Sequence, residues 1–489
     1  MDGKAAPGPL RGPAWAGGAR RDGALGRLDE PLRVAMAGRI KAGKSTLINA
    51  FLGEQVAPTD TSECTRVVTW YRGGPSPRVR VVPLVGDPVE RPVHRVDGRL
   101  QLDTAGLPVT DVRRIEVTWP SPTLSDLTLI DTPGLASLSE EISQQSLDTL
   151  VPDGSTSEVD AVVYLLRHLH AQDADVLEAF RDQQGRTAGP ATTLGVLSRA
   201  DEVGAGRLDA LLGAERVAGR YREDPAVRGL CIDVIPVAGL LAEGARTLRQ
   251  AEFDALRELA TLGRREREQL LMSADRFIAA PTSGSTDTSG EVRARLLDRL
   301  GVYGVRLSLV LIRDGFETAT ALSDELVRRS GLDRVAQVLT VQFAGRADAL
   351  KARTALLALR RELDTLGPDA DVLALREEVE AALHDAHELD EMRLLADLRS
   401  GRRPDIGTQR LADADRLIGG EGTAATARLE LSERADRETV REAALARVRE
   451  WREVESDPAL GHAEVTAART VIRSIEGLLH DLDPDPRTR

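Results

Sequence analysis

The chain has 489 residues, of which 42% are hydrophobic and only 3% aromatic, and its formal net charge is −13 at pH 7. This length predicts roughly two to four domains, and the acidic balance argues against wholesale binding of nucleic acid. No run of about 18 or more apolar residues occurs, so a helix that spans a membrane is not expected. Two cysteines provide no disulfide framework, which favours a reducing, cytoplasmic setting.

The N-terminal part of the chain divides into a tail and an α/β region. Residues 1–18 are rich in Gly, Ala and Pro, which predicts a disordered tail, and residues 19–30 are expected to form a helix that packs on the helical second half. Residues 31–245 alternate short apolar runs with loops and helical patterns, which predicts a central, mostly parallel sheet flanked by helices. Strands are expected at 33–37, 67–71, 79–82, 114–118, 127–130, 161–166, 193–197 and 234–237.

Residues 38–45 read GRIKAGKS and fit the phosphate-loop pattern GxxxxGK[ST]. The loop follows an apolar strand and precedes a helix start at 46–52, the context that its chemistry requires. In such a loop backbone N–H groups wrap the phosphates, and we predict that Lys44 meets the β- and γ-oxygens while Ser45 joins the Mg²⁺ shell. The chain has only four lysines, and two of them lie here. The predicted nucleotide contacts are Gly38, Arg39, Ile40, Lys41, Ala42, Gly43, Lys44, Ser45 and Thr46.

Two further segments complete the predicted phosphate and metal site. Residues 59–66 form a polar stretch without periodicity, typical of a mobile switch loop, and Thr65 is predicted to add its hydroxyl to the Mg²⁺ shell and to act in catalysis. Thr61 is the alternative for that role. The strand at 127–130 ends in DTPG, where Asp131 can reach Mg²⁺ through water and the Gly134 N–H can approach the γ-phosphate.

The choice of base is predicted from residues 198–201, which read SRAD and follow the strand at 193–197 where the guanine motif NKxD would stand. Asp201 can accept hydrogen bonds from the N1–H and 2-amino groups of guanine, and adenine offers neither donor. When the polar groups of a site are left unpaired in this way, the site discriminates against the wrong ligand by a factor of roughly 10⁴ to 10⁵. Arg199 is predicted to stack on the base, Ser198 replaces the usual asparagine, and the Ala238 N–H is predicted to meet the guanine O6. The alternative for Asp201 is an N-cap on the helix that follows.

After residue 245 strands disappear and apolar residues recur at helical spacing, so residues 246–489 are predicted to form an elongated helical bundle. Two of its segments each allow two interpretations. Arg399, Arg402 and Arg403 surround a Gly/Pro junction and form either a basic tip for membranes or a solvated loop. Residues 302–312 form either an interfacial helix or a buried one.

Taken together, the loop GRIKAGKST, the Thr65-Arg66 pair, DTPG, the degenerate SRAD and the trailing helices resemble the dynamin-like GTPases, specifically their bacterial branch. The stretch from Ser330 to Leu356 is similar to a helix shared by those proteins. The resemblance implies GTP or GDP and Mg²⁺ as ligands, a GTPase head on a helical stalk, and a homodimer or a hetero-assembly with a related dynamin-like protein. It also implies peripheral contact with lipid at the inner face of the cell membrane, hydrolysis that moves the stalk, and no nucleic-acid partner.

The chain departs from the pattern at one place in the loop, since Ile40 and Lys41 stand where the eukaryotic family members typically have glutamine and serine. Ile40 cannot orient water. We predict that the Lys41 ammonium supplies the positive charge that other members borrow from a bound cation, with a side chain that only points to solvent as the alternative. Two other functions compete with membrane remodelling: a GTP-switched scaffold for cell-envelope or division partners, and a translation GTPase, which should carry a basic RNA-binding segment that this chain lacks.

Overall fold

The structure is a computed structural model, and it describes eleven stretches of the chain. Predictions for the tail at 1–18, for Thr61, Thr65 and Gly134, and for all of 19–30 but its last four residues lie outside them. The described residues are 27–59, 67–96, 98–133, 159–167, 171–183, 192–225, 227, 229–279, 288–367, 369–400 and 402–482.

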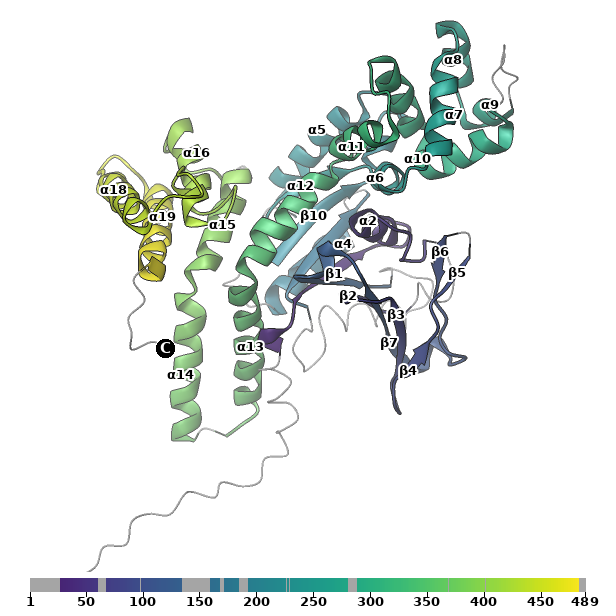
Figure 1. Ribbon diagram of the computed structural model, residues 1–489. Helices are drawn as coiled ribbons and strands as arrows, with labels where there is room; N and C mark the ends of the chain where they lie inside the picture. Colours follow the sequence, from purple (N-terminus) through teal and green to yellow (C-terminus); the bar gives the residue numbers. More distant parts are fainter. Residues whose placement is uncertain are drawn as a thin grey trace, which may run out of the picture.

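A nine-stranded sheet in the order β11-β10-β9-β1-β8-β2-β7-β3-β4 lies at the centre of the α/β region (Figure 1). The five strands from β11 to β8 are parallel, and β2 is antiparallel to β8. A separate hairpin pairs β5 with β6. The strands are β1 Leu32–Gly38, β2 Thr69–Gly73, β3 Arg78–Pro83, β4 Val89–Arg91, β5 His94–Val96, β6 Arg99–Gln101, β7 Val112–Trp119, β8 Leu127–Asp131, β9 Ala161–Leu166, β10 Thr193–Ser198 and β11 Val234–Val237.

All eight predicted strands are present, within two residues of the expected bounds, and the predicted fold class is confirmed. These strands were readily predicted because parallel strands that are covered on both faces have continuous runs of apolar residues. β9 and β10, for example, are buried at all six positions. The strands β4, β5 and β6 were not predicted, since three residues give no readable alternation.

Helices make up the rest of the described fold. They are α2 Lys44–Leu52, α4 Ala171–Gln183, α5 Ala210–Glu223, α6 Gly239–Arg246, α7 Gln250–Ala260, α8 Arg264–Leu270, α9 Ala274–Ala279, α10 Gly290–Arg313, α11 Ala319–Ser330, α12 Leu332–Gln337, α13 Ala347–Asp364, α14 Ala370–Asp385, α15 His387–Arg399, α16 Thr408–Leu417, α17 Ala425–Arg428, α18 Arg437–Glu455 and α19 His462–Leu482. Shorter turns are η1 Arg27–Asp29, η3 Val109–Asp111, η4 Pro122–Leu124, η6 Ala200–Glu202, η8 Ala344–Arg346 and the π-helical η7 Val338–Phe343.

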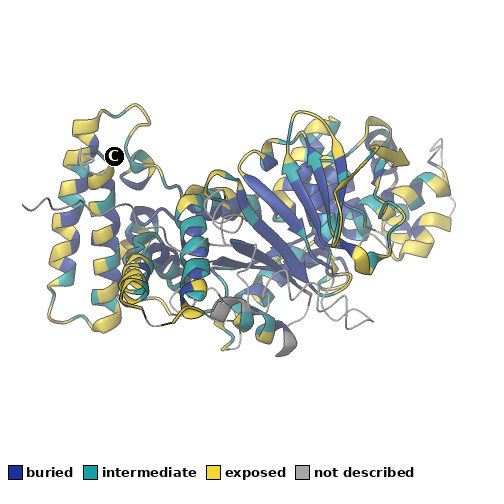
Figure 2. Cartoon of the chain, turned by 90° about the horizontal axis from the view of Figure 1, so that it is seen from below, coloured by how far each residue is buried: buried dark blue, intermediate teal, exposed yellow. Residues whose placement is uncertain are grey.

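The described residues form four hydrophobic clusters, and the two largest join most of these elements. The main core joins the sheet to α2, α6, α7, α10 and α11, so that Val34 of β1 and Leu307 of α10 belong to one cluster. A second core lies within the C-terminal bundle, the name used here for α15–α19, around Leu395 and Trp451. Between them α13 and α14 stand side by side as a long antiparallel pair (Figure 1). The central strands of the sheet are buried, whereas β4, β5 and the outer faces of the helices are exposed, the last as expected for amphipathic helices (Figure 2).

A buried ionic cluster joins the main core to the C-terminal bundle. Arg346 lies 3.0 Å and Arg428 lies 3.2 Å from opposite oxygens of Glu391, and all three side chains are at most 7% exposed. Gln342 of η7 adds hydrogen bonds to the carbonyls of Gly419 and Gly420, at 3.1 and 3.0 Å. Because a buried charge must be paired, this cluster fixes how α15, α17 and η8 meet.

The start of the described chain returns to the helices. Lys351 of α13 donates to the carbonyl oxygens of Leu28 and Glu30, at 2.6 and 3.3 Å. Arg27 pairs with Asp160, which precedes β9, at 2.9 Å. The segment before β1 is thus held both by the sheet and by α13.

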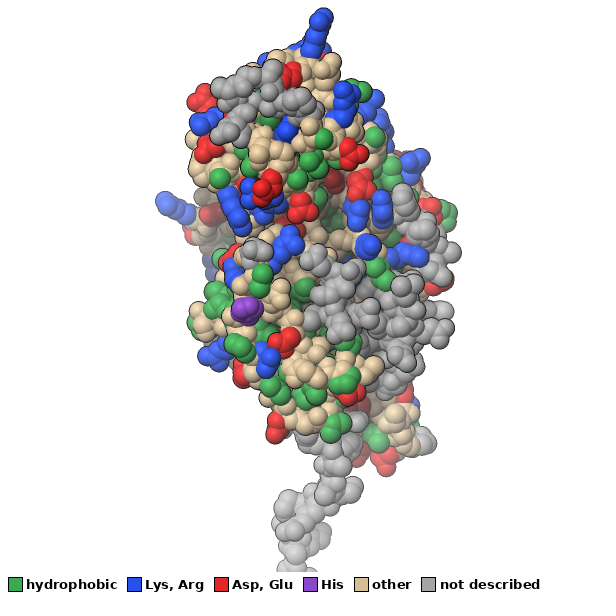
Figure 3. All heavy atoms as spheres, turned by 90° about the vertical axis from the view of Figure 1, so that its right-hand side faces the viewer, with side chains coloured by type: hydrophobic (Ala, Val, Ile, Leu, Met, Phe, Trp, Pro, Cys, Tyr) green, Lys and Arg blue, Asp and Glu red, His purple; other side chains and the backbone are tan. Residues whose placement is uncertain are grey.

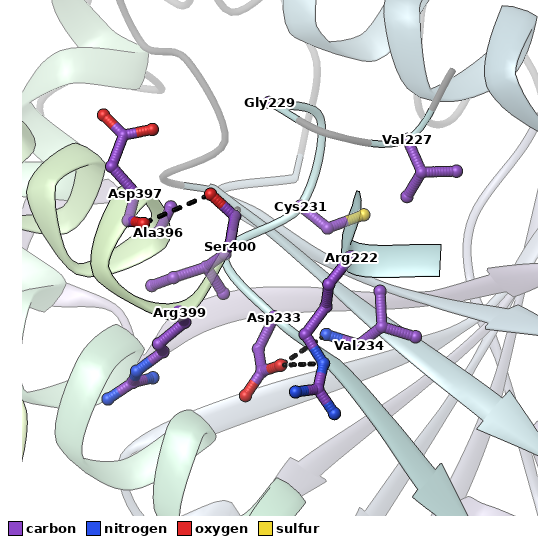
Figure 4. A pocket seen from close by; sticks show the side chains of 11 residues that line it. Arg222, Val227, Gly229, Cys231, Asp233, Val234, Ala396, Asp397, Arg399 and Ser400 are labelled. Carbon is purple, nitrogen blue, oxygen red and sulfur yellow. Dashed lines mark hydrogen bonds and ion pairs between the residues drawn. The ribbon is translucent and has the colours of Figure 1, made fainter. Parts of the chain in front are cut away.

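The three arginines predicted as a basic tip or a solvated loop lie at the seam between the sheet and α15. Arg399 and Asp233 line one cavity at this seam, where Asp233 forms an ion pair with Arg222 at 3.3 Å (Figure 4). The Arg399 Nη2 donates to the Gly420 carbonyl oxygen at 3.4 Å. The Arg402 guanidinium fills the space that a side chain at Gly229 would need. The seam cavity measures about 10 Å³, room for one water molecule at most. Arg402 and Arg403 are exposed, so the basic tip and the solvated loop both stay predictions.

The second ambiguous segment, 302–312, falls in α10 and is largely buried, including Tyr303, Leu307 and Leu311. The buried-helix interpretation is therefore confirmed. In the part of the chain that the structure describes, no helix combines the length and the apolar character needed to cross a bilayer. On the face that carries β5, β6, α8 and α9, basic and acidic side chains are interspersed (Figure 3).

Candidate active site

The phosphate loop is built where β1 leaves the centre of the sheet. Gly38 ends β1 opposite Leu165 of β9, with φ of 138°, and a Cβ there would lie 2.5 Å from the Leu165 carbonyl oxygen. Gly43 has φ of 97° and caps α2. Glycine is required at both positions, at the first because the neighbouring backbone is too close and at the second because of the backbone angle. The loop therefore turns sharply enough to bring its N–H groups to the start of α2.

Lys44, the first residue of α2, is only 9% exposed. Its ammonium donates to the carbonyl oxygens of Gly38 and Arg39, at 3.2 and 3.4 Å. Burial lowers the pKa of Lys44, and the nearby carboxylate of Asp131 opposes that shift. The geometry thus holds one compact cation inside the loop, where phosphate oxygens would replace the carbonyls.

Ser45 and Asp131 meet although they are far apart in the sequence. Met36 of β1 is paired with Asp131 of β8, so the carboxyl ends of the two strands lie together. The Ser45 hydroxyl donates to Asp131 Oδ2 at 2.8 Å. The other oxygen, Oδ1, is buried without a hydrogen-bond partner among the described residues. Burial raises the pKa of Asp131, which the Lys44 charge and the Ser45 hydrogen bond counteract.

An orphaned carboxylate oxygen beside a serine hydroxyl fits a hard divalent cation. Mg²⁺ prefers oxygen ligands and binds proteins through one or two carboxylates together with substrate phosphates and water. Ser45 and Asp131 could therefore hold Mg²⁺, either directly or through water. The unpartnered Oδ1 is the observation that favours this assignment, since a buried acceptor without a partner is costly.

Arg199 braces the phosphate loop from the base side. It has φ of 53°, and its Nη2 donates to the carbonyl oxygen of Lys41 at 3.1 Å, while its Nη1 bonds Glu202 at 2.8 Å. Lys41 itself is exposed and has φ of 59°. Sequence reasoning missed this contact, and the stacking of Arg199 on a base stays a prediction. Ser198 donates to the Leu166 carbonyl at 3.1 Å, which ties β10 to β9 in place of an asparagine brace.

Asp201 lies in η6 and is 9% exposed. The N-cap of the following helix α5 is Asp209, so the alternative that made Asp201 the cap of that helix was wrong. Burial raises the pKa of Asp201, and the charge of Arg199 is among the effects that lower it. A carboxylate in this shielded position can discriminate strongly between donors and acceptors on a base.

Ala238 follows β11 next to the Arg199 segment, because Val237 pairs with Ser198. It is fully buried, and its N–H donates to the Ser330 carbonyl oxygen at 2.9 Å. The amide is thus bonded within the protein in this arrangement, and its contact with the guanine O6 stays a prediction. The α11–α12 junction packs against this end of β11. A Cβ at Gly331 would collide with the Pro236 carbonyl oxygen, so only glycine permits that close approach.

A cavity of about 120 Å³ opens beside Thr46, lined also by Thr59, Leu240 and Arg299. Glu243 of α6 borders it and accepts from Gln55 at 2.9 Å and from Asn49 at 3.4 Å. Asn49 in turn accepts from the backbone N–H groups of Val56 and Ala57, at 2.9 and 2.7 Å. This polar chain, which sequence reasoning missed, ties α2 and α6 to the loop that leads into residues 60–66. The signal for it in the sequence was Asn49, a polar residue in an otherwise apolar first part of a helix.

This site combines a strand, a glycine loop and a helix with a buried lysine, a serine and an aspartate from the neighbouring strand. That arrangement is typical of a P-loop nucleotide-binding protein. Residues 34–200 match the sequence profile of the Dynamin family. Over 453 residues the chain is 42% identical to the isoniazid-induced protein IniC of Mycobacterium tuberculosis, covering 93% of this chain and 91% of IniC. The chain belongs to the dynamin family, and it is a GTPase of that family.

Two other similarities are narrower. The chain is 34% identical to the isoniazid-induced protein IniA of Mycobacterium tuberculosis over 143 residues, which cover 28% of this chain and 21% of IniA. A solved structure of an oligomerised bacterial dynamin pair, described as a mechanism for long-range sensing and tethering of membranes, covers 82% of this chain and 73% of its own. Its TM-score is 0.31 at 13% identity.

Proposed function

We propose that this chain binds GTP with Mg²⁺, hydrolyses it, and couples hydrolysis to membrane association and remodelling in a bacterial cell. The observation that carries the nucleotide part is the convergence of Lys44, Ser45 and Asp131, with a 2.8 Å contact between the last two. When bound, Mg²⁺ neutralises charge on the β- and γ-phosphates. Membership of the dynamin family supports the membrane part of the proposal.

Each residue of the site has a proposed task. Lys44 and the N–H groups of the phosphate loop bind and orient the phosphates, and the Gly134 N–H approaches the γ-phosphate. Ser45, Thr65 and Asp131 hold the metal. Asp201 accepts two hydrogen bonds from guanine. The remaining proposed nucleotide contacts are Gly38, Arg39, Ile40, Ala42, Gly43, Thr46, Ser198 and Arg199.

Lys41 is the proposed source of positive charge in catalysis. Its carbonyl is anchored by Arg199, and its side chain is exposed beside the loop. An ammonium held there can stabilise the negative charge that develops on the leaving phosphate, so that no bound monovalent cation is needed. This role replaces what glutamine and serine at positions 40 and 41 would supply in other members.

The helices are proposed to transmit the state of the nucleotide site. We take residues 31–245 as the nucleotide-binding unit and 246–489 as the helical unit, working as a homodimer or with a related dynamin-like protein at the inner face of the membrane. Support for tight coupling comes from the main core, which runs from the strands into α10 and α11. Nucleotide-dependent movement in α10 would therefore reach the C-terminal bundle through packed side chains.

Binding of labelled GDP and GTP tests the nucleotide part, with ADP and ATP as competitors and with or without Mg²⁺. Wild type should prefer guanine by several orders of magnitude, and Lys44→Ala should weaken binding by about 100-fold, as expected for loss of two charge-assisted hydrogen bonds. Lys351→Ala is the matched control, because that lysine bonds the Leu28 carbonyl far from the loop. Equal affinity for ADP and GDP in wild type would end this proposal.

Sedimentation with liposomes tests the membrane part. We expect binding to anionic vesicles that differs between GTP, GDP and no nucleotide. A protein that hydrolyses GTP but sediments with no vesicle in any nucleotide state would instead be a GTP-switched scaffold.

A further inference from the structure

Helix α10 is broken in its middle at Gly301. The φ of 68° and ψ of 172° at this residue are far from helical values, although the flanking residues are helical. That combination belongs to a region of backbone space that is essentially reserved for glycine. The break is therefore a specific feature of the sequence, because any other residue at position 301 would strain the chain or straighten the helix.

The break lies directly against the residue proposed to read the base. A Cβ at Gly301 would be 3.6 Å from Asp201 Oδ2 and 3.6 Å from Leu240 Cδ2. The backbone at the break thus forms the wall beside which the carboxylate lies. Leu240 belongs to α6, the helix that follows Ala238, so the break contacts both loops on the base side.

The C-terminal half of α10 also fastens the loop that carries Asp201. Arg306 Nη1 donates to the carbonyl oxygens of Gly206 and Ala205, at 2.7 and 3.3 Å, and its Nη2 donates to the Leu271 carbonyl at 2.6 Å. A Cβ at Gly206 would lie 3.8 Å from the Tyr303 backbone nitrogen. The loop from 201 to 206 therefore takes its position from α10.

Close packing holds α10 itself in place. A Cβ at Gly244 of α6 would collide with the Arg299 carbonyl, and a Cβ at Gly304 would lie 2.9 Å from Leu241 Cδ1. Glycines on both helices thus let α6 and α10 approach closely on either side of the break. A shift of α10 at Gly301 cannot be absorbed by loose packing there.

We propose that Gly301 is a positioning residue for guanine recognition: the break in α10 sets the place of the Asp201 carboxylate. Base selectivity then depends on a helix that follows the last strand of the sheet, far along the chain from the SRAD segment. This inference rests on the proposed function, because it presupposes that Asp201 accepts hydrogen bonds from guanine. Those hydrogen bonds weaken steeply when the carboxylate moves out of alignment with the guanine donors, whereas the contacts to the phosphates do not involve this carboxylate.

The test compares GDP with ADP in competition against labelled GDP, using the full chain. Gly301→Ala should weaken GDP binding by about ten-fold or more and change ADP binding less than about two-fold, because only the base site is disturbed. Gly315→Ala is the matched control. Gly315 also has a positive φ, of 105°, and nothing lies within 4 Å of a Cβ there, so this variant adds strain without touching Asp201.

A second background separates positioning from general damage. In Asp201→Ala the carboxylate is gone, so adding Gly301→Ala should change GDP binding less than about two-fold. Arg306→Ala provides a variant without backbone strain, and it should lower the preference for GDP over ADP by about three-fold or more through the loosened loop.

Several results would overturn the inference: equal losses of GDP and ADP affinity in Gly301→Ala, the same loss of GDP affinity in Gly315→Ala, or an undiminished effect of Gly301→Ala in the Asp201→Ala background. An unchanged preference in both Gly301→Ala and Arg306→Ala would also overturn it. If wild type itself shows no preference for GDP, the proposed function fails and this inference fails with it. If wild type prefers GDP and the variants behave like Gly315→Ala, only the inference fails.

Discussion

Replacing Asp201 by asparagine should convert the base preference from guanine to xanthine. The carboxylate accepts from two guanine donors, and each hydrogen bond to a charged group is worth about 1.5–3 kcal/mol. Asp201 is 9% exposed, so water compensates little for their loss. Asp201→Asn keeps an oxygen that accepts from N1–H but loses the acceptor for the 2-amino group, so it should cost about 1.5–3 kcal/mol, or about 10 to 10² in GDP affinity. Xanthine has a carbonyl where guanine has the amino group, and it accepts from the new amide.

The assay is competition of GDP, XDP and ADP against a labelled diphosphate at fixed Mg²⁺. Asp209→Asn is the control, because that carboxylate is 55% exposed and precedes α5. It should leave all three affinities within about two-fold of wild type, as expected for an exposed substitution. The reasoning is refuted if Asp201→Asn keeps the GDP affinity of wild type, or if it loses GDP without gaining XDP.

Three further outcomes are expected. Lys41→Ala should slow GTP hydrolysis more than it weakens GTP binding, and wild-type turnover should not depend on potassium if this ammonium supplies the charge. Burial raises the pKa of Asp201, so on acidification this carboxylate gains its proton at a higher pH than an exposed aspartate does, and the preference for GDP over ADP should fall as it is protonated. Glu391→Ala leaves Arg346 and Arg428 buried without their carboxylate, so urea unfolding should show a loss of about 3–5 kcal/mol.

Each of these has a contrary result. Strong potassium dependence of wild type would remove the built-in charge at Lys41. A GDP preference that stays flat on acidification would mean that Asp201 stays ionised or does not read the base. Glu442→Ala, an exposed carboxylate on α18, is the control for Glu391→Ala, and equal stability of the two variants would show that the buried cluster contributes nothing.

Residues close together in the chain were predicted well. The loop from Gly38 to Ser45 needs only its glycines, its lysine and a strand on one side, and all of these are local. Asp131 was also found, because a strand that ends in DTPG places its aspartate at the edge where β1 ends. The contact between Asp131 and Ser45 follows from the parallel pairing of their strands, which continuous apolar runs already indicate.

Residues whose partners come from distant helices were predicted poorly. The Ala238 amide looked free in the sequence, yet Ser330 occupies it, and nothing near position 238 announces that helix junction. Nothing near Arg399 and Arg402 in the sequence indicates that the first lines a cavity with Asp233 or that the second lies against Gly229. An isolated glycine within a helical pattern was the one available signal for the break at Gly301.

The sequence by itself determined the α/β sheet, the phosphate loop and the helical second half, since periodicity and turn chemistry act over a few residues and survive in the linear order. Only the tertiary structure decided that Arg199 braces the Lys41 carbonyl, that α11 fills the place beside β11, and that α10 borders Asp201. Those choices depend on packing between segments that are far apart in the sequence, up to 158 residues for Arg199 and Lys41. There, close approach and buried hydrogen bonds select one arrangement that local patterns do not encode.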